Sequence, residues 1–186
     1  TTDKLEKAKK IYAYVRDRVT STGKRGIRLS APLKTINKNK NGYVADINLL
    51  LTAMMKQQGI EAYPVILSTR SHGYTHEFYP LIDRFNYVVC AVNIDDKLYY
   101  LDGTSPALGF NHLLGECYNG HARMIMPDLA KAVYLSTDSL VEKKLSSVFI
   151  RSDSAGKWKG HSTTIAGYYE SIGVRERIKE KGEEPF

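Results

Sequence analysis

The strongest hydrophobic pattern in the chain lies between residues 41 and 70. Apolar residues recur there with the i, i+3, i+4 spacing of one helix face: Val44, Ile47, Leu50, Leu51, Met54 and Met55. Leu49 and Ala53 widen this stripe, so the pattern predicts a helix that is buried over most of its circumference. Gly59 stands where a left-handed cap would end the helix, and the apolar run 62–67 predicts a buried strand.

Weaker patterns predict the elements around this helix and strand. Residues 4–19 carry apolar and basic positions on opposite faces of a helical wheel, which is typical of an amphipathic surface helix. The apolar runs 85–94 and 98–104 flank a short polar turn and predict a β-hairpin. Residues 21–40 and 71–84 are polar and contain glycine and proline, so we expect two long loops there.

The character of the sequence changes after residue 145. Residues 146–186 predict two strands around a turn at 153–156 and then a helix from about Tyr168. We therefore divide the chain into a core, residues 1–145, and a C-terminal extension that begins at residue 146.

The order of these elements resembles the core of the transglutaminase-like (papain-like) superfamily. Residues 42–44 (GYV) lie on the G-x-C pattern of that superfamily, residues 59–62 (GIEA) follow at the expected distance, and residues 102–104 (DGT) match its D-x-T signature. The resemblance is most specific over residues 7–104. It implies an α+β fold in which a helix packs on an antiparallel β-sheet.

The resemblance also assigns three positions to a catalytic triad, and two of them lack the required chemistry. Val44 takes the place of the nucleophilic cysteine, and Asn86 or Tyr87 takes that of the histidine. Only the orienting aspartate is present, as Asp102. Valine has no nucleophilic atom, asparagine accepts no proton at neutral pH, and a tyrosine with its ordinary pKa of about 10 is a poor base. We expect no transglutaminase or cysteine-protease activity.

What the resemblance leaves is a cleft that could hold an extended polar ligand. Its expected lining is Tyr43, Val44, Arg70, Tyr87 and Asp102, beside free N–H groups at the helix start. We predict a peptide- or glycan-binding or scaffolding module that needs no cofactor. The alternative is a cleft filled by its own side chains in a purely structural spacer.

The context of the domain is predicted from the resemblance alone. It implies flanking β-rich domains of the same polypeptide and a periplasmic or cell-surface location, as in multidomain Bacteroidetes-type proteins. The extension from residue 146 would be the start of such a β-rich domain. Because an incomplete β-domain has unpaired strand edges, this extension could also pair with another molecule.

Cys117 is the other candidate nucleophile, for a cysteine-type hydrolase or acyltransferase. It precedes Tyr-Asn-Gly, a turn rather than a helix N-terminus, so nothing in the sequence lowers its pKa. His112 and His121 are scattered around it and do not have the spacing of a closed zinc site. Cys90 lies in an apolar strand and is expected to be a buried free thiol. The sequence does not decide whether Cys90 and Cys117 form a disulfide instead.

Charge and composition change this picture little. The net charge is +7, from 27 basic and 20 acidic residues, but the basic residues are spread out and not interleaved with aromatics. We therefore expect no nucleic-acid binding. His72, Tyr74 and His76 are expected to be solvated loop residues rather than metal ligands. The sequence contains no run of about 18 apolar residues, so it does not predict a transmembrane helix.

Overall fold

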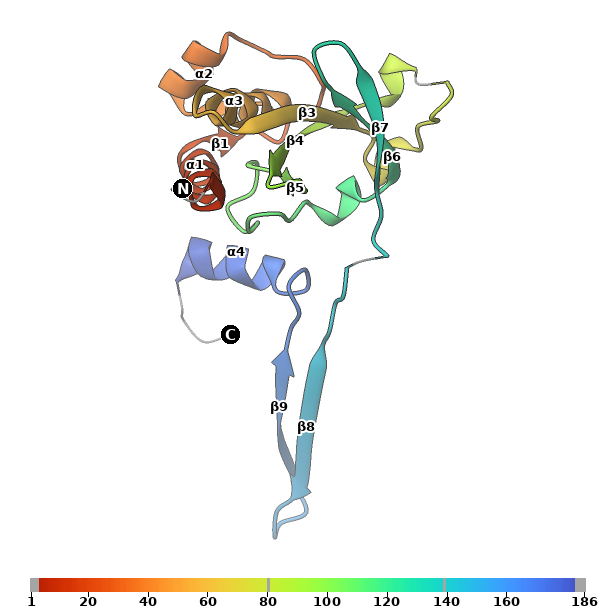
Figure 1. Cartoon of the computed structure of the whole chain (residues 1–186). Helices are drawn as coiled ribbons and strands as arrows, with labels where there is room; N and C mark the ends of the chain where they lie inside the picture. Colours follow the sequence, from red (N-terminus) through yellow and green to blue (C-terminus); the bar gives the residue numbers. More distant parts are fainter. Residues whose placement is uncertain (1–3, 80, 139, 183–186) are drawn as a thin grey trace. The chain divides into compact units, whose positions relative to one another are not determined.

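The computed structural model describes residues 4–79, 81–138 and 140–182. The chain forms two compact units, residues 1–137 and 138–186. In the first unit an antiparallel sheet is covered by helices, as the α+β prediction requires (Figure 1). Among the described residues, no helix is long and apolar enough to cross a lipid bilayer.

The sheet of the first unit has five antiparallel strands in the order β5-β4-β3-β6-β7. The strands are β3 (Glu61–Leu67), β4 (Tyr87–Ile94), β5 (Lys97–Leu101), β6 (Gly120–Ile125) and β7 (Ala130–Leu135). Strands β4 and β5 form the predicted hairpin. Its turn residues Asp95 and Asp96 have φ values of 51° and 60°, the left-handed pair that a tight two-residue hairpin requires. The sequence did not predict β7, because its first residues are exposed and its apolar pattern is short.

Helices α1 (Lys4–Arg18), α2 (Leu33–Asn39) and α3 (Val44–Gln57) belong to this unit. The buried helix α3 packs against β3 and β4, as predicted. Gly59 has φ +73°, which confirms the left-handed cap after this helix. Helix α2 lies inside the segment predicted as a loop. It is only seven residues long and buries only Ile36, so its hydrophobic signal is weak.

Strand β4 divides the core into two clusters because it is buried on both faces. Cys90, Val92 and Ile94 lie in the first cluster, with residues of α1 and α3. The alternate residues of β4 lie in the second cluster, whose members are Val44, Val65, Leu67, Tyr87, Val89, Ala91, Leu113, Cys117, Ala122, Met124, Val133 and Leu135. Val44 is the residue through which the start of α3 joins this second cluster.

Short elements complete the first unit. Strands β1 (Thr20–Ser21) and β2 (Asn41–Gly42) form a small parallel pair directly before α3. Single 3₁₀ turns lie in the connecting loops: η1 (Arg70–His72), η2 (Ile82–Arg84) and η3 (Gly115–Cys117).

The second unit consists of a β-hairpin and a helix. Strands β8 (Leu145–Ser152) and β9 (Trp158–Ile165) pair antiparallel, and helix α4 (Ile172–Lys181) follows. These are the elements that the sequence predicts, although the helix begins at Ile172 rather than near Tyr168. Every residue of both strands is exposed.

The division between the units falls after Thr137, earlier than the boundary predicted after residue 145. The reason is visible in the contacts of Glu142. Its carboxylate accepts hydrogen bonds from the N–H groups of Tyr169 (3.2 Å) and Glu170 (3.0 Å). Residues before 145 therefore already pack with the C-terminal unit.

The close approach at Gly42 yields a test of the fold. A Cβ at this position would lie 2.8 Å from Asp46 Cβ and 3.2 Å from Ile36 Cγ2. We predict that Gly42→Ala lowers the free energy of unfolding by about 1–3 kcal/mol, because the start of α3 must shift to admit the methyl group. Gly115→Ala is the matched control, since a Cβ at residue 115 would meet no atom of the described chain within 4 Å beyond its own neighbours in sequence. Urea unfolding followed by circular dichroism measures both; equal losses would contradict the packing at Gly42.

Candidate functional site

Val44 stands at the position that the resemblance assigns to the nucleophilic cysteine. It is the first residue of α3. It is 4% exposed and packs in the second cluster with Tyr87. Its N–H donates to the carbonyl oxygen of Lys24 (3.0 Å), and the N–H of Tyr43 donates to Asp46 Oδ2 (2.7 Å). The expectation of free N–H groups at this helix start is therefore wrong for these two residues, because the chain itself supplies the acceptors.

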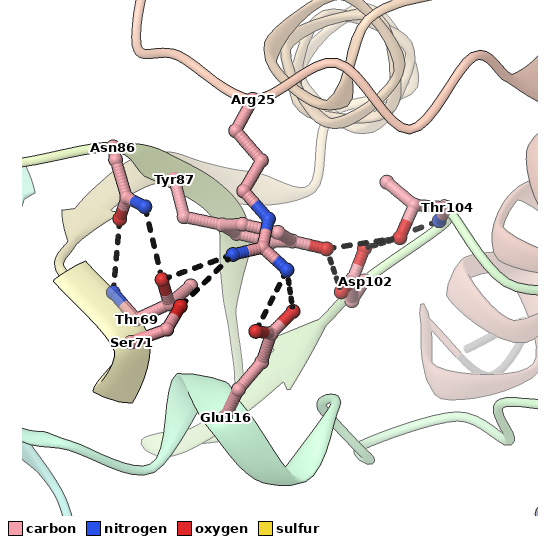
Figure 2. Close-up of polar contacts among 8 residues, drawn as sticks. All are labelled: Arg25, Thr69, Ser71, Asn86, Tyr87, Asp102, Thr104 and Glu116. Atoms are coloured by element: carbon pink, nitrogen blue, oxygen red, sulfur yellow. Dashed lines mark hydrogen bonds and ion pairs between the residues drawn. The ribbon is translucent and has the colours of Figure 1, made fainter.

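Tyr87, one of the two candidates that the resemblance gives for the histidine position, lies at the start of β4. Its hydroxyl donates to Asp102 Oδ2 (2.8 Å), and the hydroxyl of Thr104 donates to Asp102 Oδ1 (2.7 Å). The Tyr87 and Thr104 oxygens lie 3.0 Å apart, so the three side chains form a closed ring of polar contacts (Figure 2). Two hydroxyl hydrogens cannot serve three contacts at once. When both hydroxyls donate to Asp102, no hydrogen is left for the contact between the Tyr87 and Thr104 oxygens.

Asn86, the other candidate for the histidine position, has different partners. Its side-chain oxygen accepts the N–H of Thr69 (2.9 Å), and its NH₂ group donates to Thr69 Oγ1 (2.9 Å). The structure therefore brings Tyr87, and not Asn86, to Asp102.

Burial and hydrogen bonding act on the Asp102 carboxyl in opposite directions. Asp102 is fully buried, and burial raises its pKa above the ordinary 3.8 against the opposing hydrogen bonds from Asn48, Thr104 and Tyr87. Burial, followed by the charge of Asp102, also raises the pKa of Tyr87 well above its ordinary 10.0. Tyr87 therefore stays protonated at neutral pH and acts as a hydrogen-bond donor, not as a base.

Asn48 connects this group to the core helix. Its Nδ2 donates to Asp102 Oδ1 (2.9 Å) and to the carbonyl oxygen of Val88 (2.8 Å), while its Oδ1 accepts the N–H of Gly103 (2.9 Å). One buried amide thus joins α3, β4 and the segment after β5. Sequence reasoning missed this residue. Its signal was a polar side chain inside an apolar helical stretch, since buried polar groups need hydrogen-bond partners.

A second cluster of polar side chains is centred on Arg25 (Figure 2). The Nη2 atom of Arg25 contacts both carboxylate oxygens of Glu116, at 2.7 and 2.8 Å, and Nη1 donates to the hydroxyls of Thr69 and Ser71, both at 3.3 Å. These contacts attach the loop between β1 and α2 to η1 and η3. The Arg25 and Glu116 side chains are 39% and 27% exposed, so the pair is expected to stabilise the loop by only about 1 kcal/mol or less.

Cys117, the alternative nucleophile, lies in the second cluster with Val44 and Tyr87, but its thiol is not activated. Burial raises the pKa of Cys117 well above the ordinary 9.0, and the charges of Asp102 and Glu116 raise it further. A thiol in these surroundings is a weak nucleophile because little of it ionises near neutral pH.

The remaining cysteine and the two histidines near Cys117 in the sequence each have surroundings of their own. Both cysteines are free and buried, which confirms the thiol predicted for Cys90; burial raises its pKa to about 12. His112 Nδ1 lies 3.1 Å from the carbonyl oxygen of Phe110, and His121 Nδ1 lies 2.8 Å from the Thr75 hydroxyl. Within the described ranges, no three His, Cys, Asp or Glu side chains gather as metal ligands.

The five residues expected to line one cleft are not exposed together. Val44, Tyr87 and Asp102 are 4%, 1% and 0% exposed. Tyr43 lines a groove of about 710 Å³ beside residues 25–30, and Arg70 lines a different groove of about 580 Å³. The predicted single cleft is thus a buried polar core with separate surface grooves, because the side chains at the triad positions pack against one another.

The fold and this layout are those of a papain-like domain, in which the first turn of a core helix meets the start of one strand and the end of the next. Residues 1–122 match the sequence model of the transglutaminase-like superfamily. The chain belongs to that superfamily. None of the curated protein sequences matches it.

A solved structure shows the same fold. The chain is similar to the crystal structure of a protein named a "putative protease" from Parabacteroides distasonis, with a TM-score of 0.51 and 12% sequence identity. The similarity covers 74% of this chain and 25% of that one. The chain thus spans about a quarter of the length of this structural relative, and the likeness concerns the fold alone.

The Tyr87 hydroxyl gives a test of the buried ring. We predict that Tyr87→Phe lowers the free energy of unfolding by about 1–3 kcal/mol, because it removes a donor from a buried carboxyl. Tyr100→Phe is the control. Tyr100 is half-buried, and its hydroxyl has no hydrogen bond to the described residues. Chemical denaturation should show a loss below about 0.5 kcal/mol for the control. Indistinguishable losses for the two variants would argue against the ring.

Proposed function

We propose that this protein is a non-catalytic member of the transglutaminase-like superfamily that acts as a binding or scaffolding module within a larger protein. The observation that carries the proposal is the hydrogen bond from Tyr87 to the buried Asp102. The Tyr87 side chain stands where a cysteine-type enzyme needs an imidazole to accept a proton from its nucleophile.

Both reacting positions support this proposal chemically. A thiolate at a helix N-terminus is stabilised by the helix dipole and by a neighbouring imidazolium, whereas Val44 has no atom that can form an acyl-enzyme. Tyr87 stays protonated, so it cannot act as the base. Losing the nucleophile and the base together removes the chemical step instead of slowing it modestly.

The alternative is a hydrolase or acyltransferase that uses Cys117. Its position near Val44 and Tyr87 is suggestive, but its burial and its raised pKa oppose it. Cys117 is 1% exposed, so a substrate would reach its sulfur only after a rearrangement of the second cluster.

We propose that the module binds a peptide or a glycan. The two grooves, of about 710 and 580 Å³, have the size of ordinary ligand sites. The flanking β-rich domains, pairing through the C-terminal unit and a location outside the cytoplasm stay predictions.

The proposal is tested by amidase and amine-incorporation assays on the wild type, on Cys117→Ser and on the double variant Val44→Cys, Tyr87→His. We predict no turnover above buffer for the wild type and for Cys117→Ser. Turnover by the double variant alone would identify the site as a triad disarmed by two substitutions.

Wild-type turnover would refute the proposal. If Cys117→Ser then abolished that turnover, Cys117 would be the nucleophile and the alternative would be correct. Circular dichroism of each variant establishes that it is folded, so that a loss of activity cannot be mistaken for unfolding.

A further inference from the structure

We propose that the protein binds an extended acidic peptide on the open edge of β7, with side chains of the peptide entering the groove between β7 and residues 70–78. The inference rests on the proposed binding function and gives it a site and a ligand class. The groove has a volume of about 580 Å³ and lies within the first unit.

The walls of this groove are aromatic and exposed. Tyr74, Phe78 and Tyr134 are 82%, 79% and 61% exposed, and all three line it. The ring of His121, also in the lining, lies 6.0 Å from that of Tyr134. Large aromatic side chains gathered at a surface hollow are typical of interaction sites, because their rings offer a rigid apolar area at little entropic cost.

The floor of the groove has hydrogen-bonding capacity that the chain does not use. The Thr75 hydroxyl donates to the His121 carbonyl oxygen (2.8 Å), so its own oxygen can accept the Nδ1–H of that ring (2.8 Å). This arrangement leaves Nε2 of His121 as an acceptor, and it is buried without a partner among the described residues. His121 is 8% exposed. Unpaired buried polar atoms are uncommon, and a ligand that displaces residues 74–78 slightly could pair them.

The groove adjoins a sheet edge that is open. Strand β7 is the last strand in the sheet order, so one side of its backbone pairs with no strand in the part of the chain that the structure describes. At the other edge, by contrast, the N–H of Tyr100 in β5 donates to Asn111 Oδ1 (3.0 Å). A strand added to β7 would place alternate side chains on the face of Tyr134, which is the face of the groove. An extended peptide fits this combination of edge and pocket better than a glycan does.

The charges at the site select an acidic peptide. The guanidinium of Arg70 uses its Nε to contact the Tyr118 carbonyl oxygen (3.2 Å), and its side chain is exposed at the groove. Lys131 is exposed on β7 itself, on the face of the sheet opposite to the groove, where alternate side chains of an added strand would also lie. The one carboxylate in the lining, Glu77, already accepts the hydroxyl of Tyr134. A second copy of this chain would bring the same +7 net charge to the edge, which disfavours self-pairing and favours an acidic partner.

The experiment selects ligands from a display library of short random peptides and measures the binding of the enriched peptide by fluorescence anisotropy. We expect enrichment of Asp and Glu beside alternating apolar residues. Tyr74→Ser and Arg70→Gln should each weaken binding by roughly tenfold. Both side chains are exposed, so these variants should fold normally. Leu29→Ser, in the groove lined by Tyr43, is the matched control and should bind like the wild type.

Strand addition is measured separately. N-methylation of alternate peptide amides should abolish binding, and the amide resonances of β7 should shift on titration in ¹⁵N-edited NMR spectra. Equal affinity of the N-methylated peptide would overturn strand addition, and a loss confined to Leu29→Ser would overturn the site. If no peptide is enriched but a glycan array gives a signal, the ligand class is wrong. None of these results depends on the turnover assays, which test the absence of catalysis.

Discussion

The buried carboxyl of Asp102 is the interaction on which the first unit depends. A carboxyl group withdrawn from water is destabilising unless donors surround it, and here the donors come from separate parts of the chain: Asn48 in α3, Tyr87 at the start of β4 and Thr104 after β5. The backbone carbonyl oxygen of Asp102 also lies 3.1 Å from the hydroxyl of Tyr12 in α1. The same residue thus fixes two helices and the hairpin relative to one another.

This arrangement explains how the fold can persist if, as we propose, its reacting groups are lost. In a cysteine-type triad the carboxylate orients an imidazole that exchanges protons during the reaction. A phenol in the same place can replace the imidazole structurally, because its hydroxyl donates one hydrogen bond to the carboxyl. The phenol keeps its proton at neutral pH. Val44 likewise fills the space at the start of α3 and adds apolar contact to the second cluster. We propose that the two positions have lost their catalytic chemistry. Their side chains are nevertheless well packed and hydrogen-bonded in the core.

The sequence predicted the parts of the fold that have long hydrophobic patterns. The buried stripe of α3, the apolar run of β3 and the hairpin β4–β5 all follow from local periodicity and turn residues. Helix α2 and strand β7 were not predicted because each is short and half-exposed. The meeting of Val44, Tyr87 and Asp102 followed from the superfamily resemblance and not from local pattern.

The partners at the site could not be predicted in the same way, since they depend on long-range contacts. Nothing near Arg25 indicates that it meets Glu116, which is far away in the sequence. The separation of Tyr43 and Arg70 into different grooves is also a consequence of packing at Val44 and Tyr87. Unpaired atoms such as His121 Nε2 become visible only when the neighbouring loop is in place.

The central claim is that Asp102 serves the core as a buried carboxyl, hydrogen-bonded by Asn48, Tyr87 and Thr104. The most direct measurement is a pH titration of the Asp102 side-chain ¹³C resonance by NMR, with Asp102→Asn used to assign the signal. Burial within the ring predicts a pKa above the ordinary 3.8. A pKa at or below 3.8 would mean that the hydrogen bonds to the carboxylate outweigh its burial, and would contradict this account.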